Sequence, residues 1–339
     1  MLKRLGISVM VFVLLAGCSS QEADSTDGLN PGASPTASAE QSDRPAPLSP
    51  AATDEVNVPS DEATAASNVP SSTAPTKVLV PTLDPASLTA NFGFADSTGK
   101  HILAAWEDDS KLVEMKKLNR AVGHNGQLLT VRFEKWQPGH AETNGRDLAN
   151  NFANLSGYVF TVEEGSAATD ETYYLAVSEV FAPGALLAVK PAVEQLHQLK
   201  ADHPVRTAIF ALKQREIQSI WKLADLADPT GELHLYLVQF ARQDKNMLFS
   251  LVLQKNTELS FTDYPAVIQD NEYSVWRVDD GGEILPEMFS LLFAARTATG
   301  VALGINWWGA EGVNSFFLLQ QGAYMKEMDI RYSRYTSPL

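Results

Sequence analysis

Apolar and polar residues alternate over several short stretches of the chain, and this two-residue period predicts β-strands. Leu129, Val131 and Phe133, for example, alternate with polar neighbours. A polar turn at 309–312 separates two apolar runs and predicts a hairpin. Further strands are expected at 158–162, 173–181, 216–224, 233–240, 247–254, 301–308, 313–320 and 328–335.

Apolar residues recur at helical spacing in three other stretches, at 191–203, 144–155 and 286–296. In the first, Val193, Leu196 and Leu199 would share one face, and Pro204 would end the helix. The strands follow one another instead of alternating with helices. We therefore predict an α+β fold, with a mostly antiparallel sheet and a few helices.

Composition divides the chain into three parts. Residues 18–77 are rich in Ser, Thr, Ala, Pro, Asp and Glu and contain no Phe, Tyr or Trp. Such a segment cannot bury enough apolar surface to offset the entropy of ordering it, so we predict a disordered tether. Residues 78–339 are long enough to hold a core without disulfides, as one domain or as two subdomains divided near 203–214.

The amino end has the features of an export signal. Two basic residues precede an apolar run at 5–15, which as a helix would cover about 16 Å, half the thickness of a membrane's hydrocarbon layer. The tetrad Leu-Ala-Gly-Cys at 15–18 then resembles the lipobox of bacterial lipoproteins. The resemblance implies that residues 1–17 are a signal peptide and that Cys18, the only cysteine, receives a diacylglycerol.

The same resemblance implies where the protein works and what it meets. We expect it on the outer face of the cytoplasmic membrane, or in the outer membrane of a Gram-negative envelope. The formal net charge of −15 argues against nucleic acid, which requires clustered Lys and Arg. The expected partners are the membrane, through the Cys18 lipid, and either cell-wall glycan or another envelope protein.

An acidic loop is the first candidate site. Asp279, Asp280 and Glu283 surround two glycines, and oxygen-rich flexible loops can hold calcium. The spacing does not match an EF-hand loop. A solvated turn without a metal is the alternative interpretation.

Paired tryptophans are the second candidate. Trp307 and Trp308 lie on a predicted strand, where neighbouring side chains point to opposite faces. We expect one indole in the core, and an exposed partner would be able to stack on a sugar ring. The alternative is that both indoles are buried.

Catalytic signatures do not point to a reaction. The sequence contains no G-x-S-x-G, no H-E-x-x-H and no Walker phosphate loop. We therefore expect a non-enzymatic binding or interaction module. One alternative is an exported hydrolase that uses carboxylates, with a divalent cation at the acidic loop. The other is a small-solute receptor, although such receptors usually have parallel α/β lobes that consecutive strands do not fit.

Overall fold

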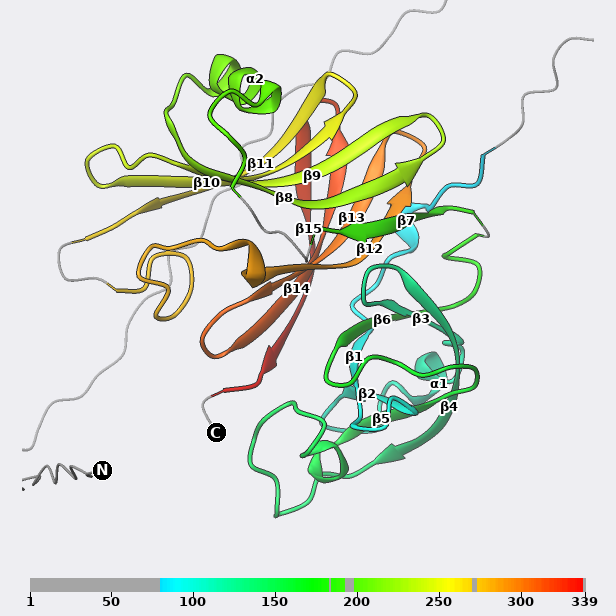
Figure 1. Cartoon of the computed structure of the whole chain (residues 1–339). Helices are drawn as coiled ribbons and strands as arrows, with labels where there is room; N and C mark the ends of the chain where they lie inside the picture. Colours follow the sequence, from blue (N-terminus) through cyan, green and yellow to red (C-terminus); the bar gives the residue numbers. More distant parts are fainter. Residues whose placement is uncertain (1–79, 183, 193–197, 270–272, 338–339) are drawn as a thin grey trace, which may run out of the picture. The chain divides into compact units, whose positions relative to one another are not determined.

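The protein is described here by a computed structural model in which strands form two closed β-barrels (Figure 1). The structure describes residues 80–182, 184–192, 198–269 and 273–337, which all belong to one compact unit, Thr73–Leu339. The predicted signal peptide, Cys18 and the tether at 18–77 lie outside the described residues. Within the described ranges, no helix has both the length and the apolar character needed to cross a membrane.

The prediction of an α+β fold is wrong, because the described part of the chain is all-β in architecture. Its α-helices are α1 (Leu112–Met115) and α2 (Pro204–Lys213), with short 3₁₀ turns such as η1 (Pro85–Ser87). Both sheets close on themselves into barrels.

The first barrel has six strands in the spatial order β1-β2-β5-β4-β3-β6. All its neighbouring strands are antiparallel, and alternate side chains such as Ile102, Tyr158 and Phe160 fill its core. The strands are β1 (Phe92–Ala95), β2 (His101–Ala105), β3 (Arg120–Gly123), β4 (Gln127–Gln137), β5 (Gly157–Val162) and β6 (Thr172–Ala176).

The second barrel has nine strands in the order β10-β11-β15-β14-β13-β12-β7-β8-β9. Leu235, Phe249 and Leu303 belong to its packed interior. The strands are β7 (Leu186–Pro191), β8 (Ile217–Asp228), β9 (Gly231–Phe240), β10 (Asn246–Lys255), β11 (Glu258–Val267), β12 (Phe289–Arg296), β13 (Val301–Trp308), β14 (Gly312–Gln321) and β15 (Tyr324–Tyr335).

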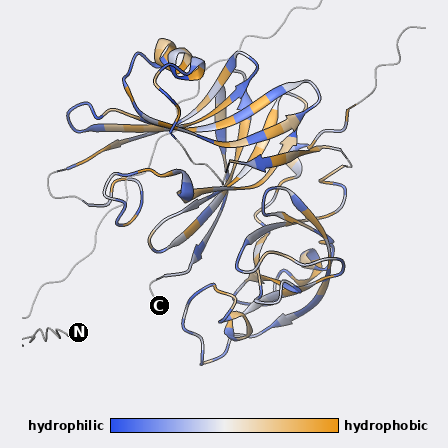
Figure 2. Cartoon of the chain, in the orientation of Figure 1, coloured by the Kyte–Doolittle hydropathy of each residue, from blue (hydrophilic) through white to orange (hydrophobic). Residues whose placement is uncertain are grey.

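Helix α2 covers the outside of the second barrel over β8, β9 and β10 (Figure 1). Its Val205 and Ile209 pack in one cluster with Val238 and Val252, so β9 and β10 are buried on both faces. Figure 2 shows apolar and polar residues interleaved along the strands of both barrels.

The predicted strands are confirmed, although the one expected at 173–181 ends at Ala176. The predicted hairpin at 309–312 joins β13 to β14. Alternation made strands such as β4 recognisable, and polar turns marked the ends of strands buried on both faces, such as β9 and β10.

The helix predictions at 144–155 and 286–296 are wrong. The first stretch holds the 3₁₀ turn η2 (Phe152–Asn154), and the second holds η4 (Pro286–Met288) followed by β12. Leu291 and Ala294 of β12 pack in the second barrel, whereas Leu292 and Phe293 pack against the first. The apolar run of β12 does not alternate and also fits helical spacing after Pro286, so it was mistaken for a helix.

The helix predicted at 191–203 is not found where it was expected. Pro191 ends β7, and residues 193–197, with Val193 and Leu196, lie outside the described residues. Helix α2 instead begins at Pro204, where the predicted helix was expected to end. Its start is capped by His203, whose Nδ1 accepts a hydrogen bond from the Val205 N–H at 3.3 Å. Proline suits the first turn because its missing N–H would have no partner there.

The two barrels share an apolar interface. Phe92 and Tyr174 of the first barrel contact Phe317 of the second at ring-centroid distances of 5.4 and 5.1 Å. The chain passes from one barrel to the other between β6 and β7. The stretch 203–214, where a subdivision was considered, contains α2 and packs on the second barrel.

Candidate functional site

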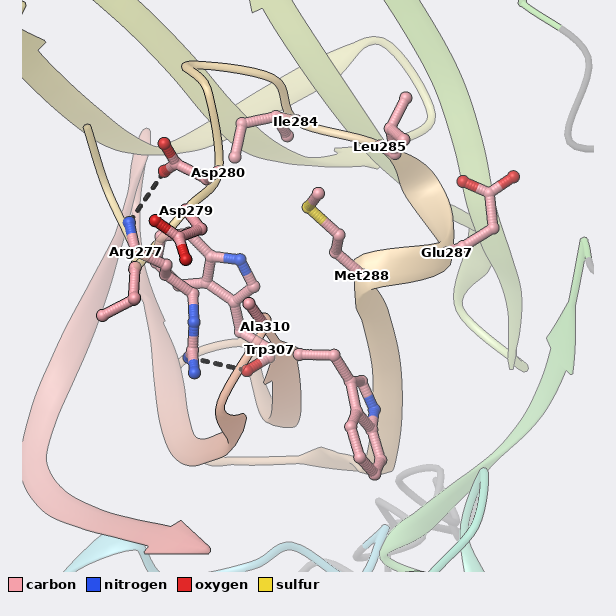
Figure 3. Close-up of a pocket in the computed structure, with 12 residues that line it drawn as sticks. Arg277, Asp279, Asp280, Ile284, Leu285, Glu287, Met288, Trp307 and Ala310 are labelled. Atoms are coloured by element: carbon pink, nitrogen blue, oxygen red, sulfur yellow. Dashed lines mark hydrogen bonds between the residues drawn. The ribbon is translucent and has the colours of Figure 1, made fainter. Parts of the chain in front are cut away.

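The segment 273–288 follows β11 and is folded around one carboxylate. Asp280 accepts hydrogen bonds from the backbone N–H groups of Val275, Trp276, Arg277 and Gly282 at 2.7–2.9 Å. Figure 3 shows the one from Arg277. Four N–H groups that would otherwise need water thus share one acceptor residue, and the loop takes a single shape around it.

Two side chains tie this segment to the second barrel. Arg277 donates from Nη1 to the Trp307 carbonyl at 2.8 Å and from Nη2 to the Gly312 carbonyl at 3.0 Å. Trp276 donates from Nε1 to the carbonyl of Tyr264 on β11 at 3.0 Å. Burial lowers the pKa of Arg277, and the nearby carboxylates of Asp280 and Glu311 act in the opposite direction.

A cavity of about 230 Å³ opens between this segment and the β13–β14 hairpin (Figure 3). We call it the loop pocket. Apolar side chains form most of its wall, and charged groups stand at its rim. The residues that the argument uses are Asp279, Ile284, Met288, Trp307, Trp308 and Ala310.

The tryptophan pair contributes both members to the loop pocket, in different ways. Trp307 is 8% exposed and stacks on Phe289 at 5.5 Å, with Phe249 edge-on at 5.3 Å. Its Nε1 is buried without a hydrogen-bond partner. Trp308 is half-buried. The indole that a ligand can reach most easily is therefore that of Trp308.

Four of the five candidate site residues line the loop pocket, namely Asp279, Asp280, Trp307 and Trp308. Asp279 stands there with a left-handed φ of 55°, beside Trp307 and Trp308. Glu283 is exposed and is not part of the wall.

The acidic loop does not assemble a ligand set of the usual kind. Within the described ranges, no group of three or more His, Cys, Asp or Glu side chains gathers closely enough to hold a metal ion. N–H donors approach both oxygens of Asp280. A cation bound there would compete with the hydrogen bonds that fold the loop.

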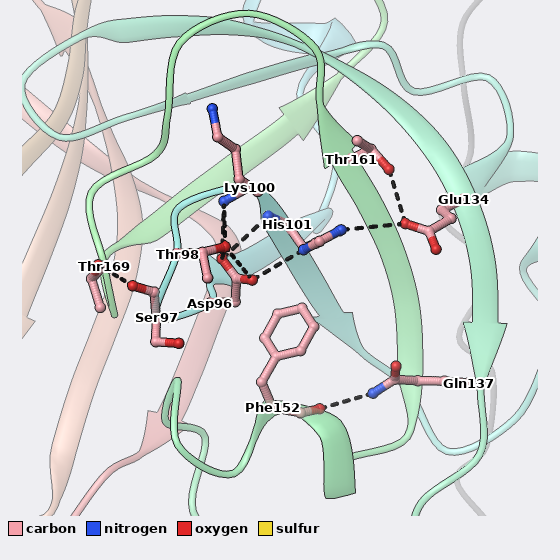
Figure 4. Close-up of polar contacts among 10 residues, drawn as sticks. All are labelled: Asp96, Ser97, Thr98, Lys100, His101, Glu134, Gln137, Phe152, Thr161 and Thr169. Atoms are coloured by element: carbon pink, nitrogen blue, oxygen red, sulfur yellow. Dashed lines mark hydrogen bonds and ion pairs between the residues drawn. The ribbon is translucent and has the colours of Figure 1, made fainter.

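A second titratable cluster lies on the first barrel (Figure 4). His101 Nδ1 is 3.0 Å from Asp96 Oδ2, His101 Nε2 is 3.6 Å from Glu134 Oε2, and Thr161 donates to the same Glu134 oxygen at 2.9 Å. Partial burial acts to raise the pKa of Asp96, but hydrogen bonds from His101, Thr98 and the backbone together lower it. These groups anchor the turn between β1 and β2.

Sequence patterns missed the apolar part of the loop pocket. Met288 lies inside the stretch 286–296 that was predicted as a helix, and Ile284, two residues before that stretch, was not singled out. The available signal was Pro286, which interrupts the apolar run and marks a turn ahead of a strand.

No protein family, curated protein or solved structure matches this chain. Its function therefore has to be inferred from the chemistry of its own sites.

Proposed function

We propose that this chain is a lipid-anchored, non-enzymatic binding module of the bacterial cell envelope. Cys18 would carry the lipid, and residues 18–77 would hold the barrels away from the membrane. The partner would be another envelope protein or the wall glycan. The loop pocket would receive an apolar or ring-shaped group of that partner.

The observation that carries this proposal is the apolar surface that surrounds the loop pocket. Val278 and Leu285, which line the pocket, are 45% and 42% exposed, although both have large apolar side chains. An exposed apolar rim around an apolar cavity is typical of a recognition site, because water is released from both when a partner binds.

Charge narrows the choice of partner. Asp279 and Glu287 stand at the pocket, and the chain carries a formal net charge of −15. The one cation in the pocket wall, Arg277, is already bound to two carbonyls. A phosphate-rich polymer or an anionic lipid surface would be repelled, whereas a neutral or cationic group would not.

Site-directed photo-crosslinking in the native host tests the proposal. A photoreactive phenylalanine replaces Trp308 at the pocket or, as a matched aromatic control, Phe210 on α2, which is 40% exposed. We expect a discrete adduct with a protein or with glycan at position 308 only. Ala310→Trp, which fills the pocket, should abolish the adduct, and Ala208→Trp on α2 should not.

Three results would contradict the proposal. The first is that the photoreactive residue at position 308 forms no discrete adduct. The second is that the adduct still forms in the Ala310→Trp variant. The third concerns the anchor: in a Cys18→Ser variant, protein that remained fully in the membrane fraction would show that lipid on this residue does not hold the chain there.

A further inference from the structure

The second barrel is closed by one weak seam. β11 pairs with β10 along its whole length, but with β15 only at Phe261 and Tyr324, in a parallel arrangement. Hydrogen bonds from the Ser260 and Thr262 hydroxyls to the carbonyls of Gly322 and Met325 reinforce this point at 2.7 Å each. Beyond Thr262 no ladder pairing joins these two described strands.

A bulge in β15 explains why the strands separate. Phe316 and Leu318 of β14 pair with Arg331 and Glu327, so residues 328–330 of β15 stand opposite the single residue Phe317. Bulges bend the strand that carries them and interrupt its ladder. Here the extra residues also bring Arg331 Nη2 to 2.8 Å from Glu327 Oε1.

The opening beside this bulge is a cleft of about 350 Å³, which we call the seam cleft. Aromatic side chains contribute to its wall: Tyr264 from β11, Trp307 from β13 and Phe316 from β14. Polar groups contribute the rest, namely Asn314, Ser315, Glu327, Arg331 and Ser333.

The polar groups of the seam cleft offer both donors and acceptors. Tyr264 donates its hydroxyl to Glu327 Oε2 at 3.3 Å, and Ser333 donates to Asn314 Oδ1 at 2.9 Å. Burial raises the pKa of the Tyr264 hydroxyl well above its usual value, and Glu327 adds to the shift, so the hydroxyl stays a donor. Arg331 is 71% exposed and has free N–H groups beyond its ion pair.

We propose that the seam cleft binds a neutral, hydroxyl-rich ring, that is, one or two sugar units of a glycan. Sugar rings have an apolar face for aromatic side chains and a rim of hydroxyl groups that both donate and accept. Trp307, whose Nε1 is buried without an acceptor, contributes its ring to this wall. The inference deepens the wall-glycan form of the proposed function and gives it a second site, which shares Trp307 with the loop pocket.

Other ligand classes fit the seam cleft less well. A fatty acyl chain would strip water from Glu327 and Asn314 without replacing their hydrogen bonds. A polyanion would meet Arg331 already paired with Glu327, in a chain with a formal net charge of −15. An extended peptide added to β11 would meet Pro265, which has no N–H to donate to a new strand.

Titration calorimetry with the full chain carrying Cys18→Ser tests the site. The probes are glucose, cellobiose, N-acetylglucosamine and N,N′-diacetylchitobiose. We expect at least one to bind, and Arg331→Ala to weaken it by about tenfold, the loss of one good hydrogen bond. Arg132→Ala is the matched control, since Arg132 forms an exposed pair with Glu163 at 3.4 Å on the first barrel, and it should change affinity less than about twofold.

The outcomes separate this site from the loop pocket. Sugar binding that survives Ala310→Trp and falls with Arg331→Ala supports the seam cleft. Binding that falls with Ala310→Trp and survives Arg331→Ala places the sugar in the loop pocket and overturns the inference. Two further results would overturn the inference: none of the four sugars binds, or an extended peptide binds in their place. The melting temperature of Arg331→Ala must show that this variant is folded.

Discussion

At the scale of single residues, Asp280 shows how one side chain can fix the shape of a loop. Its neighbour Asp279 has the same chemistry, yet it stands at the pocket rim while Asp280 accepts four backbone hydrogen bonds. Sequence could not assign these roles, because they depend on where the chain turns around each carboxylate.

The Asp→Asn change at each position separates the two roles. Asp280→Asn replaces an oxygen acceptor with an N–H donor that faces other N–H groups, so we expect a loss of about 1.5–3 kcal/mol in the free energy of unfolding. Asp279→Asn should change it by less than about 0.5 kcal/mol, because Asn also tolerates a left-handed conformation. Urea unfolding measures both, and equal losses would refute the proposed role of Asp280.

Acid should weaken the first barrel through Asp96. Its pKa is lowered in the folded state, so its contribution to stability is present above the unfolded pKa and is lost as pH falls through the folded value. We expect Asp96→Asn to be less stable than the parent at pH 6 and the difference to shrink below about pH 4. Exposed Asp109→Asn is the control, and urea unfolding at several pH values would show whether the difference stays constant instead.

Glu171 should respond to pH with the opposite sign. Burial raises its pKa, with partial compensation from His124 and Arg334, so the ionised form costs stability at every pH above the folded pKa. Glu171→Gln should therefore be more stable than the parent at pH 7, and the gain should vanish below about pH 4.3. The same unfolding series measures it, with exposed Glu164→Gln as the charge-matched control that should give no comparable gain.

At the scale of elements, prediction from sequence found most strands, including the stretch 328–335 of β15, but took β12 for a helix and did not reveal the bulge in β15. Apolar residues on both faces of β12 hid its period. In β15, Glu327 and Arg331 have helical spacing, but they meet because a bulge folds the strand between them. The loop pocket combines residues of two candidate sites that the sequence offered separately, the acidic loop and the tryptophan pair, and no local pattern predicted that they would meet. The seam cleft depends on strand register, which no local pattern reveals either.

Close packing between β12 and β13 requires a glycine. A Cβ at Gly304 would lie 2.9 Å from the Phe293 ring and 3.0 Å from the Leu292 Cβ. Gly304→Ala should cost about 1–3 kcal/mol from overpacking. In the Phe293→Leu background, where the ring is gone, the same change should cost less, and a double-mutant cycle in urea measures the coupling. Strictly additive effects would mean that the ring is not the obstacle.

At the scale of the whole molecule, β15 connects the two barrels. Its Arg334 is 2% exposed, and its guanidinium donates to the Asp147 carbonyl at 3.0 Å, to the Thr172 hydroxyl at 3.2 Å and to the Asp170 carbonyl. All three acceptors belong to the first barrel or its loops. Burial lowers the pKa of Arg334, so these contacts hold a charge that has been removed from water.

Replacing this arginine should uncouple the barrels. Arg334→Met keeps a long side chain but leaves buried acceptors without donors, at a cost of about 2–4 kcal/mol. Because those acceptors lie on the first barrel, we expect calorimetry to resolve two unfolding transitions in the variant where the parent shows one. Arg331→Met is the matched control on the same strand, since Arg331 is 71% exposed. A single, unshifted transition in Arg334→Met would mean that the apolar contacts of Phe92, Tyr174 and Phe317 hold the barrels together without it.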